Sequence, residues 1–211
     1  MRISRLQYIT ASPEQAEVAC RAGVDWVQLR VKNRSDDDWK ALALETLAVC
    51  RQYNAQLIIN DHVVLAGELG ADGVHVGKED LPVAEARRLL GPSMIIGGTA
   101  NTLEDIRGHH AAGADYIGLG PYRFTTTKEK LSPILGLEGY RTLLGACALE
   151  GLSLPIIAIG GIEVEDVPAI LQQGVHGIAV SAAITRQTVK QVPAFWQAIQ
   201  SAYSYSIPEK P

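Results

Sequence analysis

Short apolar runs alternate along the chain with longer stretches in which apolar residues recur every three or four positions. The runs predict eight strands, at residues 6–10, 26–30, 57–60, 73–76, 94–99, 116–121, 155–160 and 177–182. Residues 57–59 and 156–159 are apolar at consecutive positions, which is typical of parallel strands covered on both faces. The pattern therefore predicts buried parallel strands separated by helices.

The stretch after the second run shows the helical spacing clearly. Its apolar and small residues at positions 39, 42, 46, 49 and 53 step onto one face of a helix. Ser35 is suited to cap the start of this helix, and the aspartates at 36–38 complement the positive end of its dipole. We therefore interpret the three aspartates as a solvated helix start and not as a metal cluster.

A repeated junction supports the alternation. Residues 22–27, 69–74, 112–117 and 173–178 are variants of one pattern, in which a glycine follows a helix and an apolar run follows the glycine. The glycine suits the left-handed conformation that often ends a helix. Recurring strand–helix pairs with short connections predict an α/β fold, a single (βα)₈ TIM barrel over residues 1–203 with a C-terminal tail at 204–211. An open doubly wound sheet is the alternative, but it normally has a glycine-rich turn where this chain has Ala11-Ser12-Pro13.

Composition narrows the class of protein. The 211 residues are 47% hydrophobic and 20% charged, which fits one globular domain. The net charge is −4 and basic residues do not cluster, so nothing indicates a nucleic-acid or membrane surface. The three cysteines lack zinc-site spacing and their odd number argues against a disulfide framework, and no export signal or apolar span stands out. We therefore expect a cytoplasmic protein.

Polar residues stand where the predicted strands end. Because active sites of such barrels form at the carboxyl ends of the strands, these residues are candidates for one site. They are Gln28, Arg30, Lys32, Asn60, Asp61, His75, Lys78, Asp80, Thr99, Thr125, Thr126, Thr127 and Lys128.

Two of these side chains suit a metal-bound diphosphate. Asp61 and Asp80 can hold Mg²⁺, which takes few protein ligands and completes its shell with water and phosphate oxygens. Arg30, Lys32 and Lys128 would neutralise the remaining charge. Taken singly, each aspartate is better explained as a helix cap. Their coincidence with three cations and Asn60 favours the metal site.

The last two strands indicate a second anion site. Gly160-Gly161 follows the seventh run, and Ser181 and Ala182 stand at the end of the eighth, where backbone N–H groups can bind a phosphate. Thr125 and Thr127 can add hydroxyl donors. Two anion sites in one mouth imply two phosphorylated substrates or one substrate phosphorylated at both ends, and the residues alone leave both open.

At these positions the chain resembles the thiamin phosphate synthase family, from residue 8 to Ile184. The resemblance rests on several segments in order, which are residues 28–32 (QLRVK), 59–61 (IND), 73–80 (GVHVGKED), 118–121 (GLGP), 125–128 (TTTK) and 158–162 (AIGGI). It implies a transferase of thiamine biosynthesis that joins a hydroxymethylpyrimidine diphosphate to a thiazole phosphate and releases pyrophosphate by a dissociative substitution.

The resemblance also implies roles for individual residues. Arg30, Lys32, Asn60, Thr99 and Lys128 would hold the diphosphate, Asp61 and Asp80 would hold Mg²⁺, and Gln28 would contact the pyrimidine. Thr125, Thr127, Gly161, Ser181 and Ala182 would bind the thiazole phosphate. His75 receives no acid or base role, and whether His75 and Lys78 contact substrate is left open.

Three positions depart from the family pattern. Lys78 replaces a frequent glutamine, Phe124 a proline and Ala182 a serine, so the phosphate site loses a hydroxyl at 182. The rival functions are a thiazole tautomerase of the sister family, a non-catalytic barrel that binds thiamin phosphates, and an isomerase of phosphorylated sugars. None of these three rival functions requires the residues assigned to the diphosphate to act together. The expected partners are small-molecule substrates, with a homo-oligomer left open.

Overall fold

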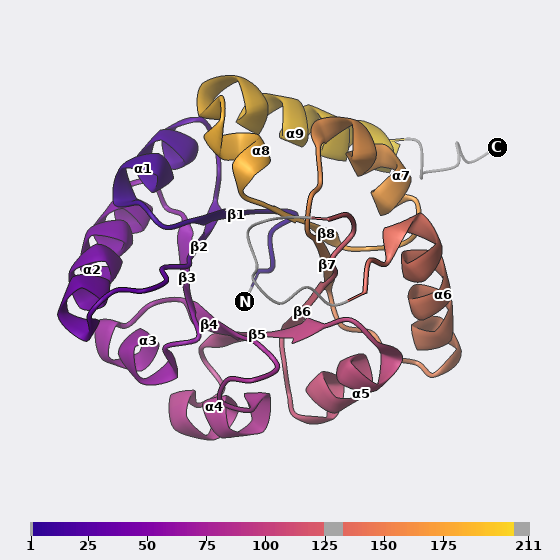
Figure 1. Ribbon diagram of the computed structural model, residues 1–211, viewed down its shortest axis with the longest axis horizontal. Helices are drawn as coiled ribbons and strands as arrows, with labels where there is room; N and C mark the ends of the chain where they lie inside the picture. The colour runs from indigo at the N-terminus through magenta and orange to yellow at the C-terminus, as the bar shows by residue number, and fades with distance from the viewer. Residues whose placement is uncertain (1, 125–132, 205–211) are drawn as a thin grey trace.

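The computed structural model describes residues 2–124 and 133–204. Within them, eight parallel strands pair in sequence order and close into a barrel, β1 also pairing with β8. Helices surround the barrel, as the view along its axis shows (Figure 1). The predicted TIM barrel is therefore confirmed, and the open doubly wound sheet is excluded.

The strands are short and follow the predicted runs. They are β1 Leu6–Thr10, β2 Trp26–Leu29, β3 Gln56–Asn60, β4 Gly73–Val76, β5 Ile95–Ala100, β6 Tyr116–Leu119, β7 Ile156–Ile159 and β8 Gly177–Val180. The helices are α1 Pro13–Arg21, α2 Asp36–Gln52, α3 Val63–Leu69, α4 Val83–Leu90, α5 Leu103–Ala111, α6 Gly136–Leu149, the 3₁₀ turn η1 Val164–Asp166, α7 Val167–Leu171, α8 Ala182–Thr185 and α9 Thr188–Ser204.

Alternate residues of each strand face opposite sides, which builds two cores. Residues such as Val27, Leu29 and Ile59 face outward and pack beneath the helices. A smaller cluster, which includes Trp26 and Tyr116, fills the barrel interior. Both faces of every strand are therefore covered, which explains the continuous apolar runs.

Local signals in the sequence are realised as expected. The junction glycines 23, 70, 113 and 174 all have positive φ, between 61° and 108°. The Ser35 hydroxyl accepts the backbone N–H of Asp38 at 3.2 Å and caps α2. The junction and cap predictions are thus confirmed.

Four strands end one or two residues before the positions that we predicted. β2 ends at Leu29, one residue before Arg30. β6 ends at Leu119 because Pro121 has no N–H to donate to a ladder. β7 ends at Ile159 because Gly160 and Gly161 adopt positive φ, which lies outside the β region. β8 stops at Val180, where the chain turns into α8. The shorter strands leave these residues in loops at the barrel mouth.

None of the helices in the described part of the chain is long and apolar enough to cross a membrane. The last helix, α9, ends at Ser204, the first residue of the predicted tail.

Candidate active site

A cavity opens where the strands end at their carboxyl termini. Every strand, or the loop that follows it, contributes to its wall. Of the residues predicted for the site, the wall contains Gln28, Arg30, Asn60, Asp61, His75, Asp80, Thr99, Gly161, Ser181 and Ala182. The topology thus brings residues from eight separate segments to one place.

Two carboxylates meet at one side of this cavity. Asp61 follows β3 with φ of 65°, and its N–H donates to the His75 carbonyl at 2.8 Å. Asp80 lies in the loop after β4, where its carboxylate accepts the Gly77 N–H at 2.8 Å. The side chains of Asp61 and Asp80 interact directly. Neither caps a helix, because the residues that precede α3 and α4 are His62 and Pro82.

The two carboxylates of this pair repel each other. The pKa of Asp61 is raised to about 7, first because protein surrounds the carboxyl and then because Asp80 bonds to it and repels its charge. Arg30 and the Asn60 amide oppose this rise. A divalent cation would relieve the repulsion, and Mg²⁺ requires only one or two carboxylates from the protein. Within residues 2–124 and 133–204, no group of three or more His, Cys, Asp or Glu could hold a metal.

Two predicted cations lie apart from the cavity wall. Lys32 lies beyond the end of β2 and is not among the lining residues. Lys78 pairs with Asp105 at 2.5 Å, so its ammonium group is directed to the start of α5. The sequence could not reveal this pairing because Asp105 lies in the next strand–helix unit.

Asp105 holds several donors at once. Its carboxylate accepts the N–H groups of Asn101 and Thr102, each at 2.9 Å, and completes a capping box with the Thr102 hydroxyl. Burial would raise the pKa of Asp105, but Lys78 and these amides outweigh it and lower the pKa to about 2.

We expect Asp105→Asn to lower the free energy of unfolding by about 1–2 kcal/mol at neutral pH, because it removes a charged cap and an ion pair. The folded pKa lies below the unfolded value, so this stability is present above about pH 4 and is lost as pH falls toward about 2. Denaturant titration of both proteins across this range measures it. Glu104→Gln is the control, because Glu104 is exposed in the same turn; equal losses in both variants would contradict the capping role.

The loop after β7 contains the two glycines that we predicted to bind a phosphate. Gly160 and Gly161 have φ of 100° and 67°, and a Cβ at Gly161 would lie 2.8 Å from the Phe124 carbonyl oxygen. The extension of β6 pairs with this loop, since the N–H groups of Tyr122 and Arg123 donate to the carbonyls of residues 159 and 160 at 2.8 and 2.9 Å. The glycines are therefore required both for the turn and for the close approach of the neighbouring strand extension.

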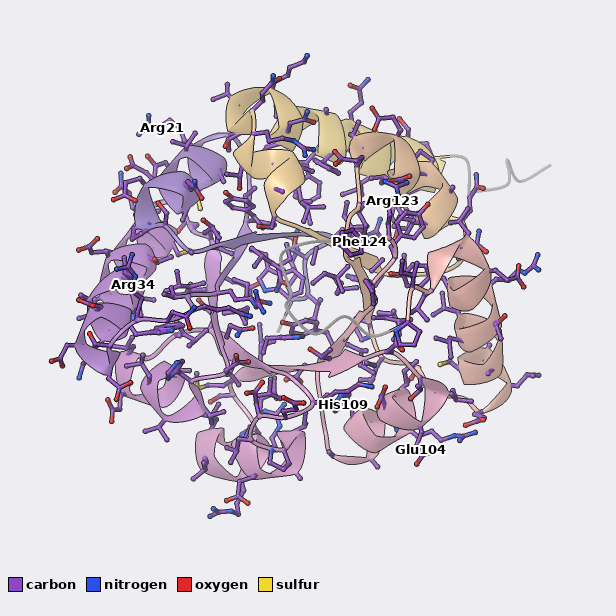
Figure 2. All side chains as sticks on the ribbon, in the orientation of Figure 1. Arg21, Arg34, Glu104, His109, Arg123 and Phe124 are labelled. Carbon is purple, nitrogen blue, oxygen red and sulfur yellow. The ribbon has the colours of Figure 1, made fainter. Side chains whose placement is uncertain are left out.

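Ion pairs join the loops around the glycine turn, and sequence reasoning missed them. Arg123 donates to the Gly161 carbonyl at 3.1 Å and to Asp166 at 2.7 Å. Arg186, after α8, donates to Glu163 at 2.7 Å, and Glu163 lines the cavity. Figure 2 shows Arg123 and Phe124 on the inner side of the helix ring, whereas Arg21 and Glu104 project from its outer side. The sequence alone could not have identified the carboxylates that these two arginines contact.

The threonine segment cannot be placed. Thr125, Thr126, Thr127 and Lys128 lie outside the described residues, and Phe124 is the last described residue before them. Their predicted roles therefore remain predictions.

The fold and the cavity define a barrel enzyme whose carboxylates, cation and glycine turn gather at the carboxyl ends of the strands. Comparison with known proteins identifies the family of this enzyme. Residues 3–184 match the family described as thiamine monophosphate synthase, and the chain belongs to that family.

The relatives support this membership over nearly the whole chain. The chain is 52% identical over 185 residues to a thiamine-phosphate synthase of Bacteroides fragilis, covering 85% of this chain and 91% of the relative. It is 50% identical over 187 residues to that of Bacteroides thetaiotaomicron, covering 86% and 90%. Among solved structures, a thiamine phosphate pyrophosphorylase from Pyrococcus furiosus superimposes with a TM-score of 0.82 at 29% identity, covering 94% and 96% of the two chains.

Proposed function

We propose that this chain is a thiamine-phosphate synthase, which joins an aminopyrimidine methyl diphosphate to a thiazole phosphate and releases pyrophosphate. The observation that carries the proposal is the meeting of the Asp61–Asp80 pair, Arg30 and the Gly160–Gly161 turn in one cavity. A tautomerase or a sugar phosphate isomerase needs one phosphate site and has no use for the carboxylate pair.

Mg²⁺ is the proposed cofactor, held by Asp61 and Asp80. The donor set fits, since two adjacent carboxylates that repel each other offer hard oxygen ligands and leave room for diphosphate oxygens and water. When bound, the ion would neutralise negative charge on the departing pyrophosphate.

The side chains would divide between the two substrates. Arg30, Lys32 and Lys128, with Asn60 and Thr99, would hold the diphosphate, and Gln28 would orient the pyrimidine. Backbone groups of Gly161, Ser181 and Ala182, with Thr125 and Thr127, would hold the thiazole phosphate. Each assignment follows from position at the cavity or, for residues 125–128 and Lys32, from the sequence alone.

These placements support a dissociative substitution. The bond between the pyrimidine methylene and the diphosphate oxygen breaks, and its electron pair leaves with pyrophosphate. The lone pair of the thiazole nitrogen then forms the new C–N bond. No proton moves in this step, so the site needs fixed positive charge rather than a general base. The cations at the diphosphate end serve that need.

Purified protein given both substrates and Mg²⁺ is expected to form thiamin phosphate and pyrophosphate in equal amounts. Omitting either substrate, or adding EDTA, should abolish both products. Chromatography of thiamin phosphate together with a coupled pyrophosphate assay measures this. Folded protein that forms neither product with all three components present would overturn the proposal.

A further inference from the structure

A line of polar side chains crosses the barrel interior beneath the cavity. The Gln28 amide donates to the Gln7 carbonyl oxygen at 3.1 Å, and the Gln7 amide donates to the Tyr116 hydroxyl at 3.3 Å. The Tyr116 hydroxyl lies 3.0 Å from His75 Nδ1, and His75 Nε2 lies 2.9 Å from the Thr99 hydroxyl. We call these five residues the relay. It joins β2, β1, β6, β4 and β5, and both of its ends line the cavity.

The barrel makes room for the relay with glycines. A Cβ at Gly97 would lie 2.2 Å from Tyr116 Cζ and 2.6 Å from His75 Nδ1. A Cβ at Gly118 would lie 3.0 Å from His75 Cε1. The two rings therefore occupy space that any larger residue at Gly97 would fill, and they have little freedom to turn.

Burial makes the hydrogen bonds of the relay obligatory. Gln7, Gln28 and Tyr116 are between 0% and 2% exposed, and His75 is 7% exposed. A buried polar group without a partner costs about 1–3 kcal/mol. Burial also raises the pKa of Tyr116 above its ordinary value, so the phenol keeps its proton. Each member must donate or accept in agreement with its neighbours.

With a neutral imidazole, the hydrogen bonds of this chain can all point in one of two directions, which we call its two senses. In the structure the amides donate toward Tyr116. The sense that continues this direction has the phenol donating to His75 Nδ1 and the Nε2 hydrogen donated to Thr99, across the contacts of 3.0 and 2.9 Å. The Gln28 carbonyl oxygen is then left for the cavity as an acceptor, and the Thr99 hydroxyl hydrogen as a donor. In the opposite sense every bond reverses, Gln28 presents its NH₂ group and Thr99 presents only lone pairs.

We propose that the relay is a specificity device, which couples an acceptor at Gln28 to a donor at Thr99 and so selects a pyrimidine diphosphate that bears an amino group. The inference rests on the proposed function. An amino group needs an acceptor and an anionic diphosphate needs a donor, so both ends of this substrate stabilise the same sense. An oxo group in place of the amino group requires the opposite sense at Gln28 and conflicts with the anion at Thr99. Tyr116 and Gln7 are positioning residues in this device.

The first test needs no turnover. Long-range ¹⁵N–¹H spectra of the substrate-free protein report which imidazole nitrogen carries the proton. We expect His75 as the neutral Nε2–H form, because Nδ1 accepts from Tyr116, and its signal is assigned as the histidine that Tyr116→Phe shifts. A proton on Nδ1 would overturn the proposed sense.

The second test measures discrimination. We expect Tyr116→Phe to lower the ratio of kcat/KM for the aminopyrimidine diphosphate to that for its oxo analogue by about tenfold. Tyr140→Phe is the matched control, because Tyr140 is equally buried and its hydroxyl donates to the Leu119 carbonyl at 2.8 Å, outside the relay. Its ratio should stay within about twofold of the original.

The outcomes separate the two proposals. Equal losses for both substrates in Tyr116→Phe would make Tyr116 merely structural and overturn the device. Failure of the unaltered protein to turn over either substrate would instead overturn the proposed function, while the imidazole spectra would still decide the sense of the relay.

Discussion

Asp61→Asn is expected to lower kcat by about 100-fold or more, equivalent to at least about 2.7 kcal/mol of lost transition-state stabilisation. The substitution removes one of two carboxylates proposed to hold Mg²⁺ and leaves the volume nearly unchanged. Asparagine also tolerates the left-handed backbone that Asp61 adopts at φ of 65°. The loss should therefore reflect charge and not backbone strain. Steady-state kinetics across a range of Mg²⁺ concentrations measures it.

The stability of the metal-free variant should change in the opposite direction. The folded pKa of Asp61 is raised to about 7, above its ordinary value, so ionising this group at higher pH costs stability. Asparagine removes that cost, and thermal unfolding above neutral pH should show a Tm equal to or higher than that of the original chain. Asp25→Asn is the control, because it removes a charge just before β2, at the opposite end of the barrel. Near-normal kcat in Asp61→Asn would contradict the metal role.

The barrel could be predicted because its signals are local. The apolar runs and the junction glycines 23, 70, 113 and 174 each reflect a conformation that the chain adopts at that point. Strand ends were predicted less well, because we extended the runs to Arg30, Pro121 and Gly160, beyond the last residue that pairs as a strand. Register in a barrel is a property of pairs of strands, so it cannot be predicted from one apolar run alone.

The site could be predicted in outline for a related reason. In a parallel barrel all carboxyl ends of strands meet at one mouth, so Asn60, Asp61 and Thr99 could be grouped from their positions alone. Partners within that mouth could not be assigned. Lys78 pairs with Asp105, and the sequence did not indicate this pair because side-chain reach between neighbouring loops depends on three-dimensional spacing.

The relay was missed because its middle lies one layer below the mouth. Gln7 stands within the run at residues 6–10 and Tyr116 opens the run at residues 116–121, so neither was among the candidates at the strand ends. Counting back two residues along each strand from the residues at the mouth would have identified them. His75 and Gln28 face the interior, and the inward residue two positions before or after a mouth residue lies in the next layer of the same barrel.

Gly161→Ala is expected to raise KM for the thiazole phosphate by about 10–100-fold while KM for the pyrimidine diphosphate changes by less than about threefold. A Cβ at this position would lie 2.8 Å from the Phe124 carbonyl oxygen and 3.1 Å from Arg123 Cβ, so the neighbouring backbone must shift. The loop that we propose presents N–H groups to the phosphate then moves with it. The described diphosphate residues lie on β3 and β5 or in the loop that follows β2, and none of them belongs to the glycine turn.

The control for Gly161→Ala must share the backbone strain without the clash. Gly70 has φ of 61°, close to the 67° of Gly161, and a Cβ there would meet only Arg51 at 3.9 Å. Both variants should lose about 1–2 kcal/mol of stability from the left-handed conformation, but Gly70→Ala should leave both KM values unchanged. Initial rates with one substrate varied at a time distinguish the two cases. If Gly161→Ala raised both KM values equally, the glycine turn would not be a separate phosphate site, because its displacement would then act on the cavity as a whole.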